Sequence, residues 1–285
     1  MSAYYNEIDP YSAQWLRNLR DAGLIAPGDV DERSISDVKP NEIAGYTQCH
    51  FFAGISVWSY SLRQAGWPDD KPVWTGSCPC QPFSAAGAGK GKTDERHLWP
   101  HWFHLVSTIM PQTVFGEQVA SPDGLGWLDL VSADLEGAGY AYGVGDLCAA
   151  GFGAPHRRQR LFFGAVDPAK GLALAHDEGP QGHGRSGEVH AQTRRETSSR
   201  CGSASSVLGG EREWLWLPDG LGFHRAFEPG TSPVDNGSSG RVGRIRAYGN
   251  AIDTRAATGF IETFVDAYRD VERSFGPVVV EDLLS

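Results

Sequence analysis

The chain has 285 residues, of which 40% are hydrophobic, and a formal net charge of −10 at pH 7. This length is enough for one large globular domain with a smaller lobe. The sequence has no apolar run of about 18 residues and no basic or apolar stretch at its N-terminus, so we expect neither a membrane span nor a secretory signal. Five cysteines without a pairing pattern are typical of a reducing cytoplasm.

Strand-like and helix-like patterns alternate through residues 1–167 and return after residue 250. We expect strands at 3–5, 49–55, 73–76, 113–116, 139–147 and 161–166. We expect helices at 10–23, 97–110, 125–137 and 253–275, and one through Tyr60 that ends at Gly66. Strands separated by helices of about 10–15 residues predict an α/β fold with a doubly wound, mostly parallel sheet.

Residues 168–250 have a different composition. Gly, Ser, His, Arg and Glu dominate residues 168–210 and apolar periodicity is lost, which predicts a flexible insertion or a weakly ordered lobe. The segment 168–250 holds ten basic and nine acidic residues, and nine of the ten basic residues are arginine. The negative net charge of the chain argues against a nucleic-acid partner. Arginine, however, binds phosphates and guanine edges with paired hydrogen bonds, so this segment could still contact DNA.

The most informative stretch is residues 76–86, which follow an apolar run. Pro79 and Pro82 fix the backbone on either side of Cys80, whereas a structural cysteine is positioned by packing alone. The pattern predicts a strand that ends in a rigid loop presenting the thiol of Cys80. Cys78 and Cys80 are too close for an unstrained disulfide.

Zinc binding is the alternative for these two cysteines. His97, His101 and His104 follow them, and His97 and His101 would share one helix face. Thiolate pairs in zinc sites are usually spaced by two or more residues, and Pro100 interrupts the histidine segment. We therefore expect no metal.

Other polar residues are expected at the carboxyl ends of strands. Glu7 follows one strand, and Asp29 and Val30 are expected at the end of another, where a ribose or an adenine amino group can be met. Glu117 follows the strand at 113–116, on the same edge as the cysteine loop. Arg158 and Arg160 alternate along a strand and therefore point to one side, although a solvated basic loop would also give this pattern.

Taken together, these segments resemble the DNA cytosine-5 methyltransferases, in a compact phage or bacterial form. The loop around Cys80 resembles the catalytic loop of that family, and residues 115–119 resemble its Glu-Asn-Val motif with Gln118 in place of asparagine. Residues 51–56 resemble its first methyl-donor motif with Ser56 in place of glycine. The Glu7 and Asp29 segments precede that motif here, whereas the usual order has it first, which indicates a permutation of strand–helix units.

The resemblance implies an S-adenosylmethionine-dependent methyltransferase that acts on cytosine in double-stranded DNA, as a cytoplasmic monomer. Residues 1–167 would form the catalytic and cofactor-binding domain, 168–247 the target-recognition lobe, and 248–285 a segment that returns to the catalytic domain. The implied catalytic residues are Cys80, Glu117, Arg158 and Arg160. The implied cofactor-binding residues are Glu7, Ile8, Asp29, Val30, Phe52, Gly54, Ile55, Pro79 and Asn250. The expected DNA-binding residues are Gln81, Ser84, Lys90, Arg241, Arg244 and Arg246.

Two further readings stay open at this point. An RNA cytosine-5 methyltransferase would share the same core, although the Cys-Phe-Thr signature of that branch is absent from this sequence. A catalytically silent DNA-binding relative would not need Cys80, Glu117 and Arg160 together. Amino-directed methyltransferases need an acidic or Asn-Pro-Pro-aromatic loop, and the sequence has none.

Overall fold

A computed structural model describes residues 2–79, 98–154, 158–170, 215–218, 224–227 and 251–275. The chain divides into two compact units, one made of residues 1–176 and 239–285 and the other of residues 177–238. In the second unit, β8 (Leu215–Pro218) and β9 (His224–Phe227) pair as an antiparallel hairpin.

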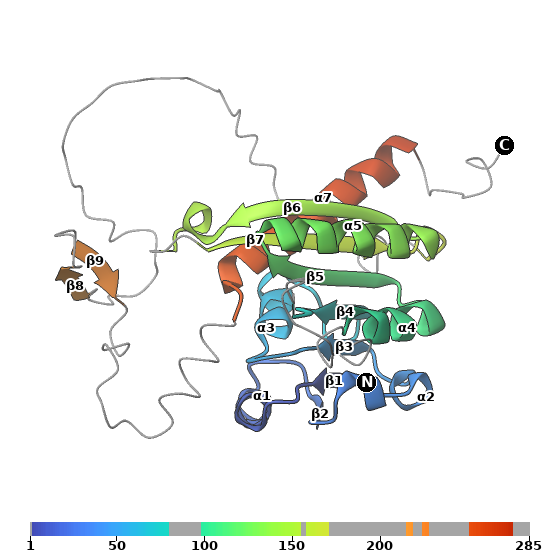
Figure 1. Ribbon diagram of the computed structural model, residues 1–285, viewed down its shortest axis with the longest axis horizontal. Helices are drawn as coiled ribbons and strands as arrows, with labels where there is room; N and C mark the ends of the chain where they lie inside the picture. The colour runs from blue at the N-terminus through green and yellow to red at the C-terminus, as the bar shows by residue number, and fades with distance from the viewer. Residues whose placement is uncertain are drawn as a thin grey trace, which may run out of the picture. The chain divides into compact units, whose positions relative to one another are not determined.

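The first unit is built on a seven-stranded sheet with the strand order β2-β1-β3-β4-β5-β7-β6 (Figure 1). Pairing is parallel from β2 through β5, and β7 is antiparallel to both of its neighbours. The strands are β1 (Ala3–Asn6), β2 (Gly28–Asp31), β3 (Gln48–Phe51), β4 (Val73–Gly76), β5 (Thr113–Val119), β6 (Ala141–Cys148) and β7 (Gln159–Val166). This confirms the predicted α/β fold with a mostly parallel sheet.

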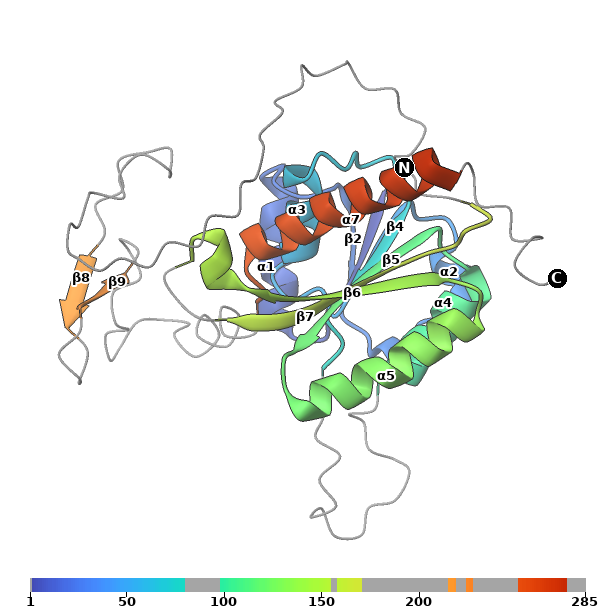
Figure 2. The same ribbon diagram turned by 90° about the horizontal axis from the view of Figure 1, so that it is seen from above.

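Helices cover both faces of the sheet, with α1, α3 and α7 on one face and α2, α4 and α5 on the other (Figure 2). The α-helices are α1 (Pro10–Asp21), α2 (Pro40–Ile43), α3 (Val57–Gln64), α4 (Trp99–Ile109), α5 (Pro122–Gly137) and α7 (Thr254–Phe275). Two short 3₁₀ helices are η1 (Ile35–Asp37) and η2 (Ala149–Phe152). Because both faces are covered, β1, β3 and β4 consist entirely of buried residues. No helix in the described ranges is long and apolar enough to cross a bilayer.

Helix starts follow local capping chemistry. The Asp9 side chain accepts a hydrogen bond from the Ser12 backbone N–H and Pro10 occupies the first turn, as the sequence predicts for α1. Pro100 likewise lies in the first turn of α4, so it begins that helix and does not interrupt it. The elements η1 and α2 were not expected from the sequence, because helical turns of three and four residues carry too little periodicity to be recognised.

An aromatic layer fixes α4 and α5 on the sheet. Trp99 makes edge-to-face contacts with Trp102 and Trp127, at ring-centroid distances of 5.5 Å each. The Trp102 ring lies so close to Gly76, the last residue of β4, that a Cβ atom there would come within 2.6 Å of it. Glycine at this position therefore brings α4 against the point where the cysteine loop leaves the sheet.

Candidate active site

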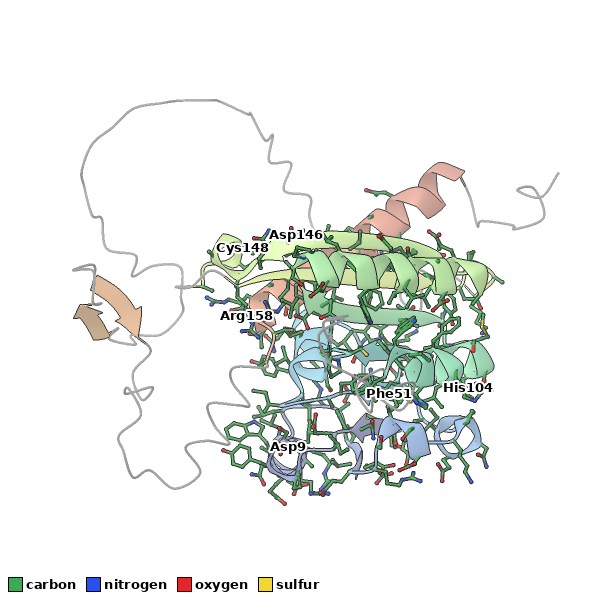
Figure 3. All side chains as sticks on the ribbon, viewed as in Figure 1. Asp9, Phe51, His104, Asp146, Cys148 and Arg158 are labelled. Carbon is green, nitrogen blue, oxygen red and sulfur yellow. The ribbon has the colours of Figure 1, made fainter. Side chains whose placement is uncertain are left out.

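A cavity of about 550 Å³ opens at the carboxyl edge of the parallel strands. It is lined by residues that follow β1, β3 and β4, by the end of β5 and by the start of β7. Asp9 and Arg158, which both line it, lie at this edge, whereas His104 lies away from it (Figure 3). In open α/β sheets a ligand binds outside the carboxyl ends of the strands, where the strand order reverses, and this cavity occupies that place.

Glu7 lies at one end of the cavity, directly after β1, as predicted. Its Oε2 accepts a hydrogen bond from the Gly54 backbone N–H at 2.6 Å, and its Oε1 accepts one from the Asp9 N–H at 2.9 Å. Burial raises the pKa of Glu7, and the two backbone donors oppose that shift. The carboxyl group thus joins the end of β1 to the turn after β3.

The turn between β3 and α3 is held in an unusual backbone conformation. Phe52, Gly54 and Ser56 have φ angles of 51°, 55° and 66°, all in the left-handed region. Ser56 is the N-cap of α3 but makes no capping bond, and its buried hydroxyl has no hydrogen-bond partner. Phe52 and Gly54 line the cavity, as predicted, whereas Ile55 packs against the core cluster under α3 and α7.

The cysteine loop leaves β4 beside the middle of the cavity. Cys78 is only 2% exposed and belongs to the hydrophobic core, and its carbonyl accepts a hydrogen bond from Gln118 Nε2 at 3.1 Å. Pro79 is exposed and lines the cavity, as does Leu98. Cys78 thus packs in the core and also contributes to the lining of the cavity. The predicted site residues Cys80, Gln81, Ser84 and Lys90 lie outside the described residues, as do Arg241, Arg244, Arg246 and Asn250.

Glu117 and Arg160 form an ion pair at the other end of the cavity. Arg160 Nε lies 2.7 Å from Glu117 Oε1, with the two side chains 17% and 8% exposed. Arg160 pairs with Val119 across β5 and β7, so Glu117 is its diagonal neighbour on the same face of the sheet. Glu117, Arg158 and Arg160, which the family resemblance implies as catalytic residues, thus line one cavity, and Glu117 and Arg160 are in contact.

The pKa of Glu117 is the most perturbed of the acids that line the cavity. Burial raises it from an ordinary 4.5 to about 7, against the opposing charges of Arg160 and Arg158 and a hydrogen bond from the Ser77 side chain. Burial also lowers the pKa of Arg158. A carboxyl group with a pKa near neutrality can hold or release a proton at physiological pH, as general acids and bases do.

The sequence placed one segment wrongly. Asp29 was expected at the end of a strand, but it is the second residue of β2, and its carboxylate accepts a hydrogen bond from Tyr46 Oη at 2.7 Å. Val30 packs against the core cluster under α1. Neither lines the cavity; Ser34 and Ile35, four to five residues later, do. The strand runs on to Asp31, and the chain reaches the cavity only after the turn that follows it.

Sequence reasoning also missed Ser77, which lines the cavity next to Glu117. Its Oγ accepts a hydrogen bond from Trp58 Nε1 at 3.1 Å, and its side chain hydrogen-bonds to Glu117. The sequence does not mark Ser77 as a site residue, because its hydrogen-bond partner Trp58 lies 19 residues away in α3 and the two meet only in the folded protein. Within the described part of the chain, no three His, Cys, Asp or Glu side chains come together as metal ligands, and His97 lies outside it.

Comparison with known proteins agrees with this geometry. The model of the C-5 cytosine-specific DNA methylase family matches residues 52–195, half of the chain. The match includes the turn after β3, the cysteine loop, Glu117 and both arginines. The chain therefore belongs to the C-5 cytosine-specific DNA methylase family.

Individual relatives match over shorter stretches. The type II methyltransferase M.AplI of Arthrospira platensis is 31% identical over 99 residues, which cover 34% of this chain and 29% of the relative. The type II methyltransferase M.AgeI of Thalassovita gelatinovora is 34% identical over 104 residues, covering 35% of this chain and 24% of the relative. The chain thus spans under a third of the length of these relatives in each alignment. Among solved structures, a DNMT2 mutant of Spodoptera frugiperda gives a TM-score of 0.41 at 16% identity, covering 57% of this chain and 41% of that one.

Proposed function

We propose that this chain transfers a methyl group from S-adenosylmethionine to carbon 5 of cytosine in DNA through a covalent adduct with Cys80. The observation that carries the proposal is the convergence of Glu117 and Arg160 in the same cavity as Pro79, the residue before Cys80. A cytosine inside a duplex cannot reach such a cavity, so the base would have to be flipped out of the helix.

The Glu7 end of the cavity suits the cofactor. A volume of about 550 Å³ lies within the usual range for a small-molecule site. A carboxylate can accept about four hydrogen bonds and two of those on Glu7 are used, so it has capacity left for ribose hydroxyls. Ile8 beside it is 64% exposed and lines the cavity, offering an apolar surface to an adenine ring, with Ser34 and Ile35 close by in the lining. When bound, the cofactor would supply an electrophilic methyl group.

At the Glu117 end, the side chains would activate the base. The Cys80 thiolate adds to carbon 6 of cytosine, and a carbon–sulfur bond forms. Glu117 hydrogen-bonds ring nitrogen 3 and the exocyclic amine, which stabilises the electron density displaced into the ring. Arg160, aided by Arg158, holds the base carbonyl. Carbon 5 would take the methyl group while the methyl–sulfur bond of the bound donor breaks and leaves a neutral thioether. Carbon 5 would then give its proton to a water molecule in the cavity, and the bond between Cys80 and carbon 6 would break to restore the thiolate.

The permuted order of the cofactor segments is also part of the proposal. The strand that leads into Phe52 and Gly54, β3, lies inside the sheet between β1 and β4, although β1 and β2 both precede it in the chain. Neighbours in space define a site, so a chain in which β1 precedes β3 can build the same cofactor cavity.

We propose further that residues 168–247 select the DNA sequence. Ten of the 25 basic residues of the chain fall within this segment, which is near neutral overall. Exchanging residues 211–247 for those of a relative with another specificity should redirect methylation. An active hybrid that still modifies the original sequence would assign recognition elsewhere.

The central test is to express the protein in cells and sequence their DNA after bisulfite treatment, which reports activity and target sequence together. Cys80→Ser should abolish methylation, whereas Cys78→Ser should leave most of it, because Cys78 is a core residue. With DNA that contains 5-fluorocytosine, the trapped adduct should map to Cys80. An adduct on Cys78, or methylation of RNA in place of DNA, would refute the proposal.

A further inference from the structure

A line of hydrogen bonds runs from the core of the protein to the carboxyl group of Glu117. Trp58 Nε1, on α3, donates to Ser77 Oγ at 3.1 Å. Gly76 pairs with Gly116 across β4 and β5, so the residues that follow them, Ser77 and Glu117, lie side by side in the cavity lining, and the Ser77 side chain hydrogen-bonds to Glu117 there. Arg160 binds Glu117 from β7, and Ser77 follows β4. Because β5 lies between β4 and β7 in the sheet, Glu117 is held by donors from the strands on both sides.

The chemistry of the indole fixes the direction of this line. An indole nitrogen can only donate, so the oxygen of Ser77 accepts from Trp58. A serine hydroxyl has one proton, which then remains for the carboxyl group of Glu117. Without Trp58, the Ser77 hydroxyl would be free to rotate and to accept from other donors.

We infer that Ser77, oriented by Trp58, is a positioning residue that donates its hydroxyl proton to the Glu117 carboxyl group and holds that group toward the cavity. The inference concerns the carboxyl group itself, and it rests on the proposed function only for what Glu117 then does to a base. Neither Ser77 nor Trp58 belongs to the residues that the sequence suggested.

The hydrogen bond of Trp58 can be removed by substitution while its aromatic packing is kept. Its ring stacks on Phe115 at 6.2 Å and meets Phe162 edge-to-face at 6.0 Å, so a phenylalanine at position 58 would keep an aromatic ring there. Trp67 is a matched control, because it packs on the same Phe115 at 5.8 Å while its Nε1 donates to the Lys71 carbonyl, away from Ser77.

Among the described residues, the charged groups that face Glu117 are Arg160 and Arg158, both from the β7 side, and both favour the ionised carboxylate. Ser77 favours it too, because a donor stabilises the charged form of an acid. Removing the hydroxyl should therefore raise the pH at which Glu117 ionises, whereas removing a purely structural contact should leave that pH unchanged.

The experiment is a carboxyl-carbon NMR titration of the full-length protein with ¹³C-labelled glutamate, in which Glu117→Gln assigns the resonance. Wild type should ionise near the pH of about 7 that its environment sets. In Ser77→Ala the midpoint should move up by roughly one pH unit or less, the size of one hydrogen bond. Trp58→Phe should move it in the same direction by less, and Ser77→Thr, which keeps the hydroxyl, should restore it.

Trp67→Phe should leave the midpoint at the wild-type pH. An unchanged or lowered midpoint in Ser77→Ala overturns the inference, as does a rise in Ser77→Thr equal to that in Ser77→Ala. An unchanged midpoint in Trp58→Phe would show that the indole N–H does not orient the Ser77 hydroxyl. The titration contains neither DNA nor methyl donor, so its outcome is independent of whether the protein methylates cytosine, which bisulfite sequencing decides.

Discussion

The two ends of the cavity each present a glutamate, half-buried Glu7 and buried Glu117, and the two carboxyl groups are held in different ways. Glu7 accepts from two neutral backbone amides, whereas Glu117 is paired with the charged Arg160 and lies near Arg158. A carboxylate held by backbone amides can accept further hydrogen bonds and forms no ion pair. A carboxyl group balanced between burial and two arginines is instead poised to exchange a proton. The first arrangement suits binding and the second suits catalysis.

Of the substitutions considered, replacing Arg160 should have the largest effect, because it removes the charged partner that distinguishes Glu117 from Glu7. In Arg160→Ala the buried carboxyl group of Glu117 loses its ion pair, so methylation should fall to background and the free energy of unfolding should drop by about 3 kcal/mol or less at pH 8. The loss should be smaller at pH 5, where Glu117 can take up a proton in place of its partner. Denaturant unfolding at pH 5 and pH 8 measures the two free energies. An equal loss at both pH values would contradict the expected pH dependence.

The stability of the protein should depend on pH through Glu117. Its pKa in the folded state, about 7, lies above its ordinary 4.5, so between these values the folded state binds more protons than the unfolded state. The free energy of unfolding therefore declines as pH rises through this window, by up to about 3 kcal/mol from this group. Glu117→Gln should remove that decline, so wild type and variant should differ in slope between pH 5 and 7. Parallel curves would rule out a raised pKa for Glu117.

At the other end, Glu7→Ala should weaken binding of S-adenosylmethionine by roughly 1–3 kcal/mol, because polar partners lose their acceptor. The variant also leaves the Gly54 and Asp9 amides without the carboxylate. Glu7→Gln keeps one acceptor oxygen, so its affinity for S-adenosylmethionine should lie between those of the wild type and Glu7→Ala. Titration calorimetry on folded protein measures the affinities, and an unchanged affinity in Glu7→Ala would remove Glu7 from the cofactor site.

The smallest expected effect concerns Ser56, in the turn that Glu7 supports. Ser56→Gly should stabilise the protein by about 1 kcal/mol, because it relieves a left-handed backbone and removes a buried hydroxyl without a partner. Ser56→Ala removes only the hydroxyl, so the difference between the two variants isolates the backbone contribution. Thermal unfolding would detect it; a Gly variant less stable than Ala would show that the turn is not strained.

The sequence predicted most of the sheet, because its strands are short apolar runs bounded by glycine or proline and separated by helices. Glu117 lies at the carboxyl edge that its place after a strand predicted, but its ion pair with Arg160 depends on the register of β5 and β7, which the sequence does not reveal. Asp29 and Val30 were misplaced, because β2 is partly exposed and its end is not marked by an apolar pattern. Ser77, Ser34 and Ile35 could not be found, since their roles depend on side chains that meet only in the folded protein.

The antiparallel pairing of β5 with β7 has a consequence for how this protein can change in length. Arg160 faces Glu117 only because Val119 and Arg160 are in register, and a strand shifted by one residue turns every side chain to the opposite face. A single-residue deletion between Arg160 and Phe163 would therefore turn the arginine away from the cavity while the sheet survived. The 3₁₀ helix η2 and residues 153–154, which follow β6, lie outside that register, so a change of length there would leave the pair of Glu117 and Arg160 in place.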